Sequence, residues 1–212
     1  MTDTSPQDAA GNSRGVWEFI WDLPVRAFHW LLAIAVAVGW YLGDNRSFSN
    51  IDYHFYIGYF VGGLVVLRLI WGFIGPKPAR LSSLFHSIPA TFAYLLTIPR
   101  REPSGTPGHN PIGSLSVLAL LVSLLVQVGT GLFAEDDGLF SAGPLSGYLS
   151  GGMVAEMNAI HYWNSRILLF LVGTHVFAVL FYLVWKRENL IRPMFTGIKY
   201  VKRTTNSDTT QV

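Results

Sequence analysis

The chain alternates between four long apolar segments and shorter polar ones. The apolar segments run roughly from Val25 to Leu42, Tyr53 to Ile74, Ile112 to Phe133 and Val154 to Trp185. A helix of about 20 apolar residues crosses the hydrocarbon core of a bilayer, which is about 30 Å thick. The pattern therefore predicts an all-α fold, an integral membrane four-helix bundle.

Two of the intervening segments have a composition typical of the membrane interface. Trp17 to Arg26 mixes tryptophans with charged residues. Leu81 to Pro99 is apolar, but it is too short and too broken by Pro89 to span a bilayer. We therefore expect an interfacial amphipathic segment between the second and third helices.

Composition agrees with a membrane protein that has polar ends. Half of the residues are hydrophobic and 13% are charged, where soluble domains average about 25% charged. Residues 1–15 lack the apolar core of a signal peptide, and residues 204–212 are also polar. We expect two disordered tails around one domain, residues 16–203.

The distribution of Lys and Arg predicts the orientation of the bundle. The N-terminal segment, the connection between the second and third helices and the C-terminal tail hold 12 of the 15 basic residues. The other two loops hold Arg46 and several carboxylates. Because basic residues accumulate on the cytoplasmic side of membrane proteins, we expect both termini in the cytoplasm.

Four histidines lie in or at the ends of the apolar segments. His161 and His175 are 14 residues apart, so they lie about 21 Å apart along one helix and within about 40° of one face. One metal ion cannot take both, because its ligands lie within about 2.3 Å of it. With the N-terminus inside, His29 and His175 share the cytoplasmic half of the bilayer. His54 and His161 share the outer half.

Two histidine pairs at different depths favour two bis-histidine haem sites. The chain has no cysteine, which excludes disulfides, iron–sulfur ligation and the covalent attachment of c-type haem. Any haem is therefore held non-covalently, as in haem b. Two imidazole ligands leave no open position on the iron, which favours one-electron transfer over oxygen chemistry.

The alternative for a single intramembrane histidine is a hydrogen bond between helices. Four histidines in two depth-matched pairs favour haem ligation over this alternative. His86 and His109 lie off the spanning helices, in the connection between the second and third helices, so we do not assign them as haem ligands.

Glycines near the histidines are candidate haem-contact residues. Gly58 is one turn from His54, Gly62 is one turn further, and Gly129 and Gly131 lie near the end of the third helix. A missing side chain lets the backbone approach a flat porphyrin. Small residues also occur at helix contacts without a cofactor, so this second interpretation stays open.

Three arginines lie within the apolar segments. Arg166 lies five residues past His161, inside the membrane, where an unpaired arginine is costly. We expect a haem propionate as its partner, with Glu156 or a water-filled cleft as the alternative. Arg68 is interpreted as snorkelling to the interface. Arg26 is close enough to His29 to reach an inner propionate, and the excess of basic residues on the cytoplasmic side explains it equally well.

The motifs together resemble the bacterial cytochrome b561 family, which includes the cytochrome b subunits of nickel–iron hydrogenases. They are WDLPVRAFHWLLA, HFYIGY followed by RLIWGFIGP, GHNPIG followed by QVGTGLF, and the histidines of the fourth helix. The resemblance covers roughly Val16 to Lys202. It implies a dihaem protein whose axial ligands are His29, His54, His161 and His175.

The resemblance also implies partners and a location. They are two haem b groups, a membrane quinone or quinol, membrane lipid, and a hydrogenase-like or cytochrome c-like redox protein. It implies the bacterial inner membrane, with no nucleic acid as partner, and leaves a homodimer open.

We therefore expect a dihaem b-type cytochrome that relays electrons across the bilayer between quinone and a redox partner. No catalytic residue is assigned, and quinone oxidoreductase activity is left open. One alternative is a non-catalytic haem-binding anchor subunit of a larger complex. A metal-ion transporter is disfavoured, because transporters usually show repeats and carboxylates near the midplane, and these four segments show neither.

Overall fold

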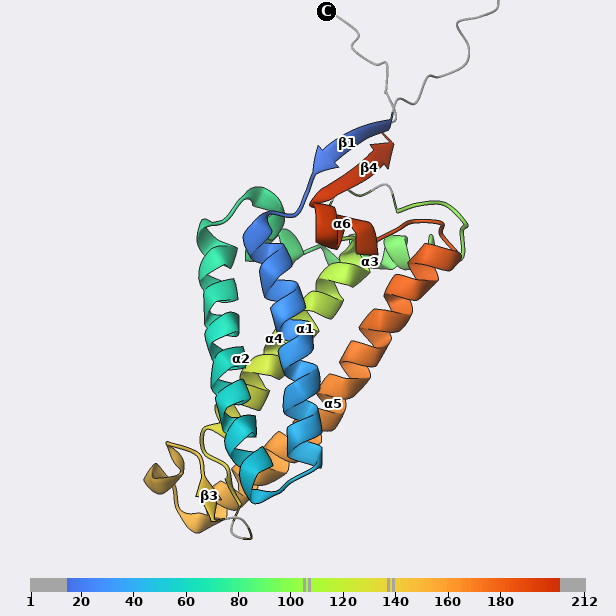
Figure 1. Cartoon of the computed structure of the whole chain (residues 1–212). Coiled ribbons are helices and arrows are strands. Elements are labelled where there is room, and N and C mark those ends of the chain that lie inside the picture. Colours follow the sequence, from blue (N-terminus) through green and yellow to red (C-terminus); the bar gives the residue numbers. More distant parts are fainter. Residues whose placement is uncertain (1–14, 105, 107, 137, 139, 203–212) are drawn as a thin grey trace, which may run out of the picture.

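Four long helices form the body of the protein. The structure is a computed structural model that describes residues 15–104, 106, 108–136, 138 and 140–202. The helices are α1 (Leu23–Asp44), α2 (Phe48–Ile74), α4 (Pro111–Gly131) and α5 (Gly151–Val184) (Figure 1). Each is long and apolar enough to cross a membrane, so the predicted membrane bundle is confirmed.

Shorter elements connect these helices. Along the chain they are β1 (Gly15–Phe19), the 3-10 turns η2 (Lys77–Ala79) and η3 (Leu81–Leu84), α3 (Ile88–Leu95), β2 (Glu135–Asp136), β3 (Ser141–Ala142), the 3-10 turn η5 (Ser146–Tyr148), α6 (Ile191–Thr196) and β4 (Ile198–Lys202). The predicted tails lie outside the described residues, apart from Gly15 in β1.

Polar residues fix where three of the helices begin. Asp22, Ser47 and Asn110 each accept a hydrogen bond from the backbone N–H three residues further on, at 3.1, 3.2 and 2.7 Å. These bonds satisfy donors that have no partner inside the helix. The cap at Ser47 starts α2 at Phe48, one turn before the apolar pattern that predicts a start near Tyr53.

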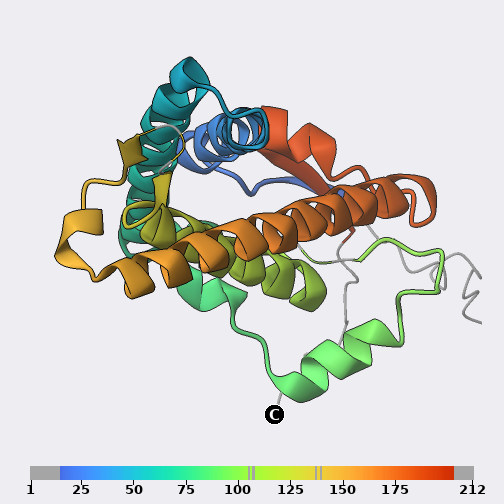
Figure 2. The ribbon, with the colours of Figure 1, turned by 90° about the horizontal axis from the view of Figure 1, so that it is seen from below.

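The core lies where all four helices meet. Its buried residues are Ala35 of α1, Val61 and Val65 of α2, Leu124 of α4 and Leu168 of α5. Figure 2 shows α1 and α2 on one side of the bundle and α4 and α5 on the other. Most other apolar side chains on these helices point outward, as expected for surfaces that face lipid.

A polar contact also joins α4 to α5 inside the bundle. Ser123 Oγ donates to Asn164 Oδ1 at 3.1 Å, and Asn164 Nδ2 donates to the Ser123 carbonyl at 2.9 Å. The same Nδ2 donates to Gln127 Oε1 at 2.7 Å. Such hydrogen bonds fix two helices relative to each other where no water competes.

Two strands that are far apart in the sequence form a ribbon that sequence analysis did not predict. β1 pairs antiparallel with β4, with Trp17 opposite Tyr200, and the two strands lie beside α6 at the end of the bundle where α1 begins (Figure 1). Trp17 was predicted to lie in an interfacial segment. A strand of five residues gives too short a pattern to predict when its partner is about 180 residues away. We call β1, α6 and β4 together the terminal cap.

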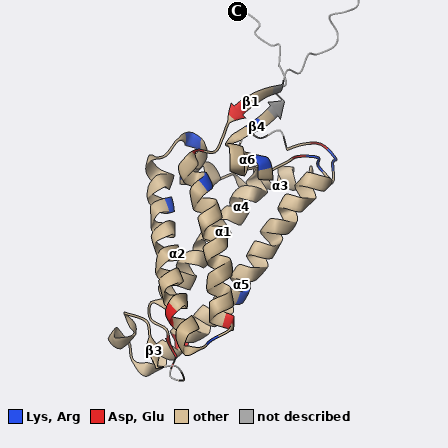
Figure 3. Cartoon of the chain, in the orientation of Figure 1, with Lys and Arg blue, Asp and Glu red and all other residues tan. Residues whose placement is uncertain are grey.

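The segment predicted as amphipathic does not span the bundle, as expected. Residues 81–99 contain the short helices η3 and α3. Phe85, Ile88, Phe92 and Leu96 are exposed on this segment. Figure 3 shows basic residues mostly toward the end of the bundle that carries the terminal cap. Exposed apolar side chains beside basic residues suit the membrane interface.

Candidate functional site

The four intramembrane histidines form two pairs in the bundle. His54 of α2 faces His161 of α5, with ring centroids 6.0 Å apart and ring planes at 85°. His29 of α1 faces His175 of α5, with centroids 6.3 Å apart and planes at 52°. These are the pairs that helix depth predicts. We call them the outer pair and the inner pair, after the expected orientation.

The spacing within each pair suits a metal ion between the two rings. When two opposed imidazoles each place a nitrogen about 2 Å from a metal, their centroids lie about 6 Å apart. The distances of 6.0 and 6.3 Å match this requirement. Two imidazoles alone do not complete a coordination sphere, and the four nitrogens of a porphyrin supply the remaining positions. The ring spacing of both pairs is therefore compatible with bis-histidine haem.

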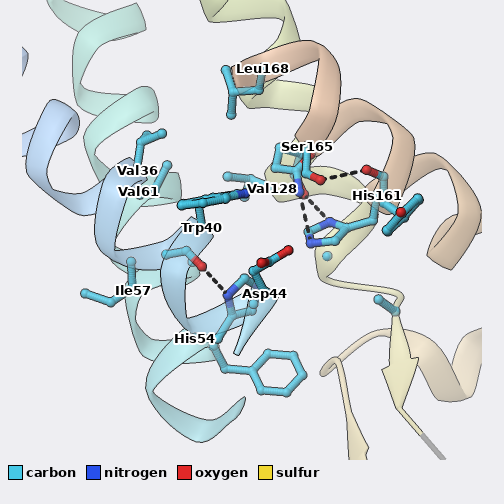
Figure 4. Close-up of a pocket in the computed structure, with 18 of the residues that line it drawn as sticks. Val36, Trp40, Asp44, His54, Ile57, Val61, Val128, His161, Ser165 and Leu168 are labelled. Carbon is cyan, nitrogen blue, oxygen red and sulfur yellow. Dashed lines mark hydrogen bonds between the residues drawn. The ribbon is translucent and has the colours of Figure 1, made fainter. Parts of the chain in front are cut away.

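A large cavity adjoins the outer pair. Its volume is about 680 Å³, within the usual range for pockets that hold small molecules and cofactors. Figure 4 shows His54 and His161 projecting toward this space from opposite sides, with Val36, Ile57 and Leu168 on its walls. Apolar walls with few polar groups suit the macrocycle of a haem.

Hydrogen bonds at the outer pair fix which ring nitrogen carries the proton. His54 Nδ1 lies 2.8 Å from the Gly39 carbonyl, and His161 Nδ1 lies 3.0 Å from the Gln127 carbonyl. A carbonyl only accepts, so each Nδ1 carries the proton and each Nε2 presents its lone pair. Thr130 Oγ1 lies 3.3 Å from the same Nδ1 of His161.

The side chain of Gln127 occupies the ligand position of His161. Its amide nitrogen lies 3.0 Å from His161 Nε2 and donates to that lone pair. An iron atom takes the same lone pair, so haem ligation requires the amide to turn aside. Asn164 Nδ2 already donates a hydrogen bond to Oε1 of the same Gln127 amide. Sequence analysis did not assign a role to Gln127.

Arg166 lies at the mouth of the cavity and has an acidic partner. Its Nη2 is 3.1 Å from Asp44 Oδ1 of α1, so its carboxylate partner is Asp44 and not Glu156. Arg46 forms a second ion pair at the same mouth, 2.9 Å from Asp136. Two cations therefore border the cavity. The expected propionate partner of Arg166 stays a prediction.

The predicted glycines occupy different surroundings. Gly58 lines the cavity, and a Cβ added there would meet open space. A Cβ on Gly62 would lie 3.1 Å from Val128, so Gly62 serves the contact between α2 and α4. Gly129 has open space around it but is not among the residues that line the cavity. A role for these glycines toward haem stays a prediction.

Arg68 does not snorkel to the interface, as sequence analysis expected. It is 5% exposed, and its Nη1 is buried without a hydrogen-bond partner. The chain after α2 folds back over this end, and Leu81 packs against Gly72 so closely that an added Cβ would lie 2.5 Å from it. Protein therefore covers the guanidinium where sequence analysis expected water. Arg26 donates through Nη1 to the carbonyl of Phe195 in α6.

His109 lies near the same end of the bundle, just before α4. Its ring is 4.6 Å from that of Trp21. Burial, and after it the positive charge of Arg68, lowers the pKa of His109 to about 4. His109 is therefore neutral near pH 7. His86 lies in the connection before α3, outside the spanning helices.

Comparisons with known proteins agree with this arrangement. Residues 20–197 match the family model described as prokaryotic cytochrome b561. The chain is 25% identical to the probable Ni/Fe-hydrogenase 1 B-type cytochrome subunit of Escherichia coli K12, over 87% of this chain and 91% of that protein. It is 23% identical to the probable Ni/Fe-hydrogenase B-type cytochrome subunit of Bradyrhizobium diazoefficiens, over 84% of each chain.

A third relative has a similar description. It is the probable Ni/Fe-hydrogenase B-type cytochrome subunit of Rhodobacter capsulatus, 22% identical over 94% of this chain and 88% of that protein. No solved structure gives a significant match. The family model covers all four spanning helices and the four paired histidines. The chain therefore belongs to the prokaryotic cytochrome b561 family.

Proposed function

We propose that the protein is a dihaem b-type cytochrome that relays electrons across the membrane between a quinone and a redox partner protein. Membership of a b-type cytochrome family implies haem b and electron transfer. The observation that carries the dihaem proposal is the presence of two opposed histidine pairs, at 6.0 and 6.3 Å, at two levels of one bundle.

Each part of the bundle has a distinct task in this proposal. The two pairs hold the haems, which supply a one-electron iron couple when bound. α5 contributes one ligand to each pair, and the 14-residue spacing of His161 and His175 sets the separation of the two sites along its axis at about 21 Å. The apolar walls exclude water, and Arg46 and Arg166 offer positive charge to the propionates of the outer haem.

The comparisons and the charge distribution support the proposed partners. The relatives described as hydrogenase B-type cytochrome subunits support a hydrogenase-like redox partner, with a cytochrome c-like protein as the alternative. The basic residues near the terminal cap support a cytoplasmic location of that end in the bacterial inner membrane. The partner then docks at the outer end, and membrane quinone is the second redox partner.

Purified protein is expected to contain two non-covalent haem b groups per polypeptide. A pyridine haemochrome assay with protein quantification measures this ratio, and acid–acetone extraction tests the non-covalent attachment. A soluble quinol analogue should then reduce both haems. One haem or none per chain, or haem that resists extraction, contradicts the dihaem proposal. Haems that quinol leaves oxidised favour the membrane-anchor function.

Arg166 is expected to raise the midpoint potential of the outer haem. A nearby cation stabilises the added electron, so Arg166→Gln should lower this potential and Arg166→Lys should lower it less. Asp44 offers a matched control of opposite sign, because Asp44→Asn removes the anion that pairs with Arg166 at 3.1 Å and should raise the potential. Redox titration measures both haems. Equal shifts at both haems would show that Arg166 acts elsewhere.

A further inference from the structure

Both histidines of the outer pair contact a neighbouring helix in the same way. His54 Nδ1 lies 2.8 Å from the carbonyl of Gly39 in α1. Four residues further along α1 is Gly43, and a Cβ added there would lie 2.9 Å from His54 Cε1 and 3.1 Å from its Nδ1. The edge of the imidazole therefore rests directly on the backbone of α1.

His161 repeats this arrangement on a different helix. Its Nδ1 lies 3.0 Å from the carbonyl of Gln127 in α4. Four residues further along α4 is Gly131, and a Cβ added there would lie 3.0 Å from His161 Cε1 and 3.3 Å from its Nδ1. The carbonyl and the glycine are again four residues apart.

Helix geometry explains the four-residue spacing. A helical carbonyl already accepts the N–H four residues further on, and its second lone pair points outward. The Cβ of that later residue tilts toward the helix N-terminus, over the same carbonyl. At Gly43 and Gly131 this Cβ would lie 2.9–3.3 Å from the two nearest imidazole atoms, too close for the ring to stay in place. Glycine at the later position therefore makes room for the ring on its carbonyl.

We propose that Gly39 with Gly43, and Gln127 with Gly131, are two carbonyl–glycine clamps that position the outer histidines for haem. This inference rests on the proposed function. Each clamp fixes the proton on Nδ1, leaves the lone pair on Nε2 for the iron and sets the plane of its ring. At His161 the Gln127 amide must first turn aside from Nε2. Because the clamps lie on different helices, they hold the two outer rings nearly perpendicular, at 85°.

The inner pair provides an internal contrast. His29 Nδ1 is buried, and no residue that the structure describes forms a hydrogen bond with it. The inner rings lie at 52° to each other. A hydrogen bond from Nδ1 to a carbonyl raises the basicity of the ligand and favours ferric iron. The two haems therefore differ in ligand orientation and in ligand basicity.

The clamps are tested by Gly43→Ala and Gly131→Ala, with Gly63→Ala as the control. Gly63 is exposed on α2, and an added Cβ there would meet open space. In the two test variants the added methyl pushes an outer ring off its carbonyl, which lowers ligand basicity. We expect the outer haem alone to show a raised midpoint potential and an altered EPR anisotropy, which depends on the angle between the imidazole planes. Reduced protein should also gain a fraction that binds carbon monoxide.

The outcomes distinguish a failure of the clamp proposal from a failure of the proposed function. Selective loss of the outer haem in the test variants, with the inner haem retained, also supports the clamps. Unchanged outer signals in both test variants overturn them, as does equal loss of both haems or the same change in Gly63→Ala. A wild-type protein without two haems overturns the proposed function itself, and this is measured first.

Discussion

Replacing His29 or His175 by alanine is expected to remove one haem, and replacing His54 or His161 is expected to remove the other. Each haem depends on two imidazoles from two helices, so losing either ligand leaves the iron with one protein bond. The two rings of each pair lie 6.3 or 6.0 Å apart, whereas the pairs themselves lie at different levels along α5. Removing one pair should therefore leave the other intact.

The pyridine haemochrome and the reduced-minus-oxidised spectrum measure this effect. Each variant should retain about half of the wild-type haem, and the two variants of one pair should lose the same spectral component. His86→Ala is a control, because His86 lies outside the spanning helices. It should retain both haems. Loss of the same component in His29→Ala and His54→Ala would disprove the pairing.

The helices were predictable because their signal is local. About 20 apolar residues in a row are enough to indicate a spanning helix, and Lys and Arg counts then indicate which ends lie together. With direction known, His29 and His175 share a level, as do His54 and His161. The structure places the rings of each pair side by side. The membrane topology predicted from the sequence was therefore enough to predict which histidines lie opposite each other.

Contacts between distant segments could not be predicted in the same way. The strand β1 has no local partner, because its register with β4 joins Gly15 to Lys202. The burial of Arg68 depends on how the chain folds back over α2 after Pro76, which periodicity does not indicate. In both places the tertiary contact, and not the local pattern, decides the structure.

The detailed surroundings of the outer histidines were also beyond sequence analysis. Gly43 stands at the end of the first apolar segment, where a glycine is explained well enough by a turn. Its contact with His54 depends on the crossing of α1 and α2. Gln127 was given no role from the sequence. The two hydrogen bonds of its side chain, to His161 and Asn164, depend on the packing of α4 against α5.

The terminal cap is held by a buried ion pair outside the spanning helices. Glu188 and Lys199 lie 2.7 Å apart, with side chains 7% and 11% exposed. Ser104 donates to the same carboxylate through its backbone N–H at 2.7 Å and its hydroxyl at 2.8 Å, and Lys199 also donates to the Thr106 carbonyl. One carboxylate thus joins the chain after α5, strand β4 and the loop before α4.

The charge of Glu188 is maintained by these contacts. Burial raises the pKa of Glu188, but the hydrogen bond and charge of Lys199, together with the Ser104 donors, outweigh burial and lower the pKa below its ordinary value. A carboxyl group with a lowered pKa stabilises the fold fully above its unfolded pKa. That contribution is lost as the pH falls through the lower, folded pKa.

Glu188→Ala is expected to release the terminal cap while both haem sites stay assembled. The substitution leaves the largely buried Lys199 without its carboxylate partner, and removing one member of a fully buried ion pair costs about 3–5 kcal/mol, which is an upper bound here. Limited proteolysis should cut the loop around Ser104 and the chain after α5 much faster in the variant, at unchanged haem content.

The double variant Glu188→Gln with Lys199→Met is the control. It leaves no charge unpaired, so it should recover much of the protease resistance. Wild-type resistance should also fall in acid, below about pH 4.5, whereas Glu188→Gln alone should lack that part of the pH dependence. Equal protease resistance in Glu188→Ala and wild type would show that the cap is held by β1–β4 pairing instead.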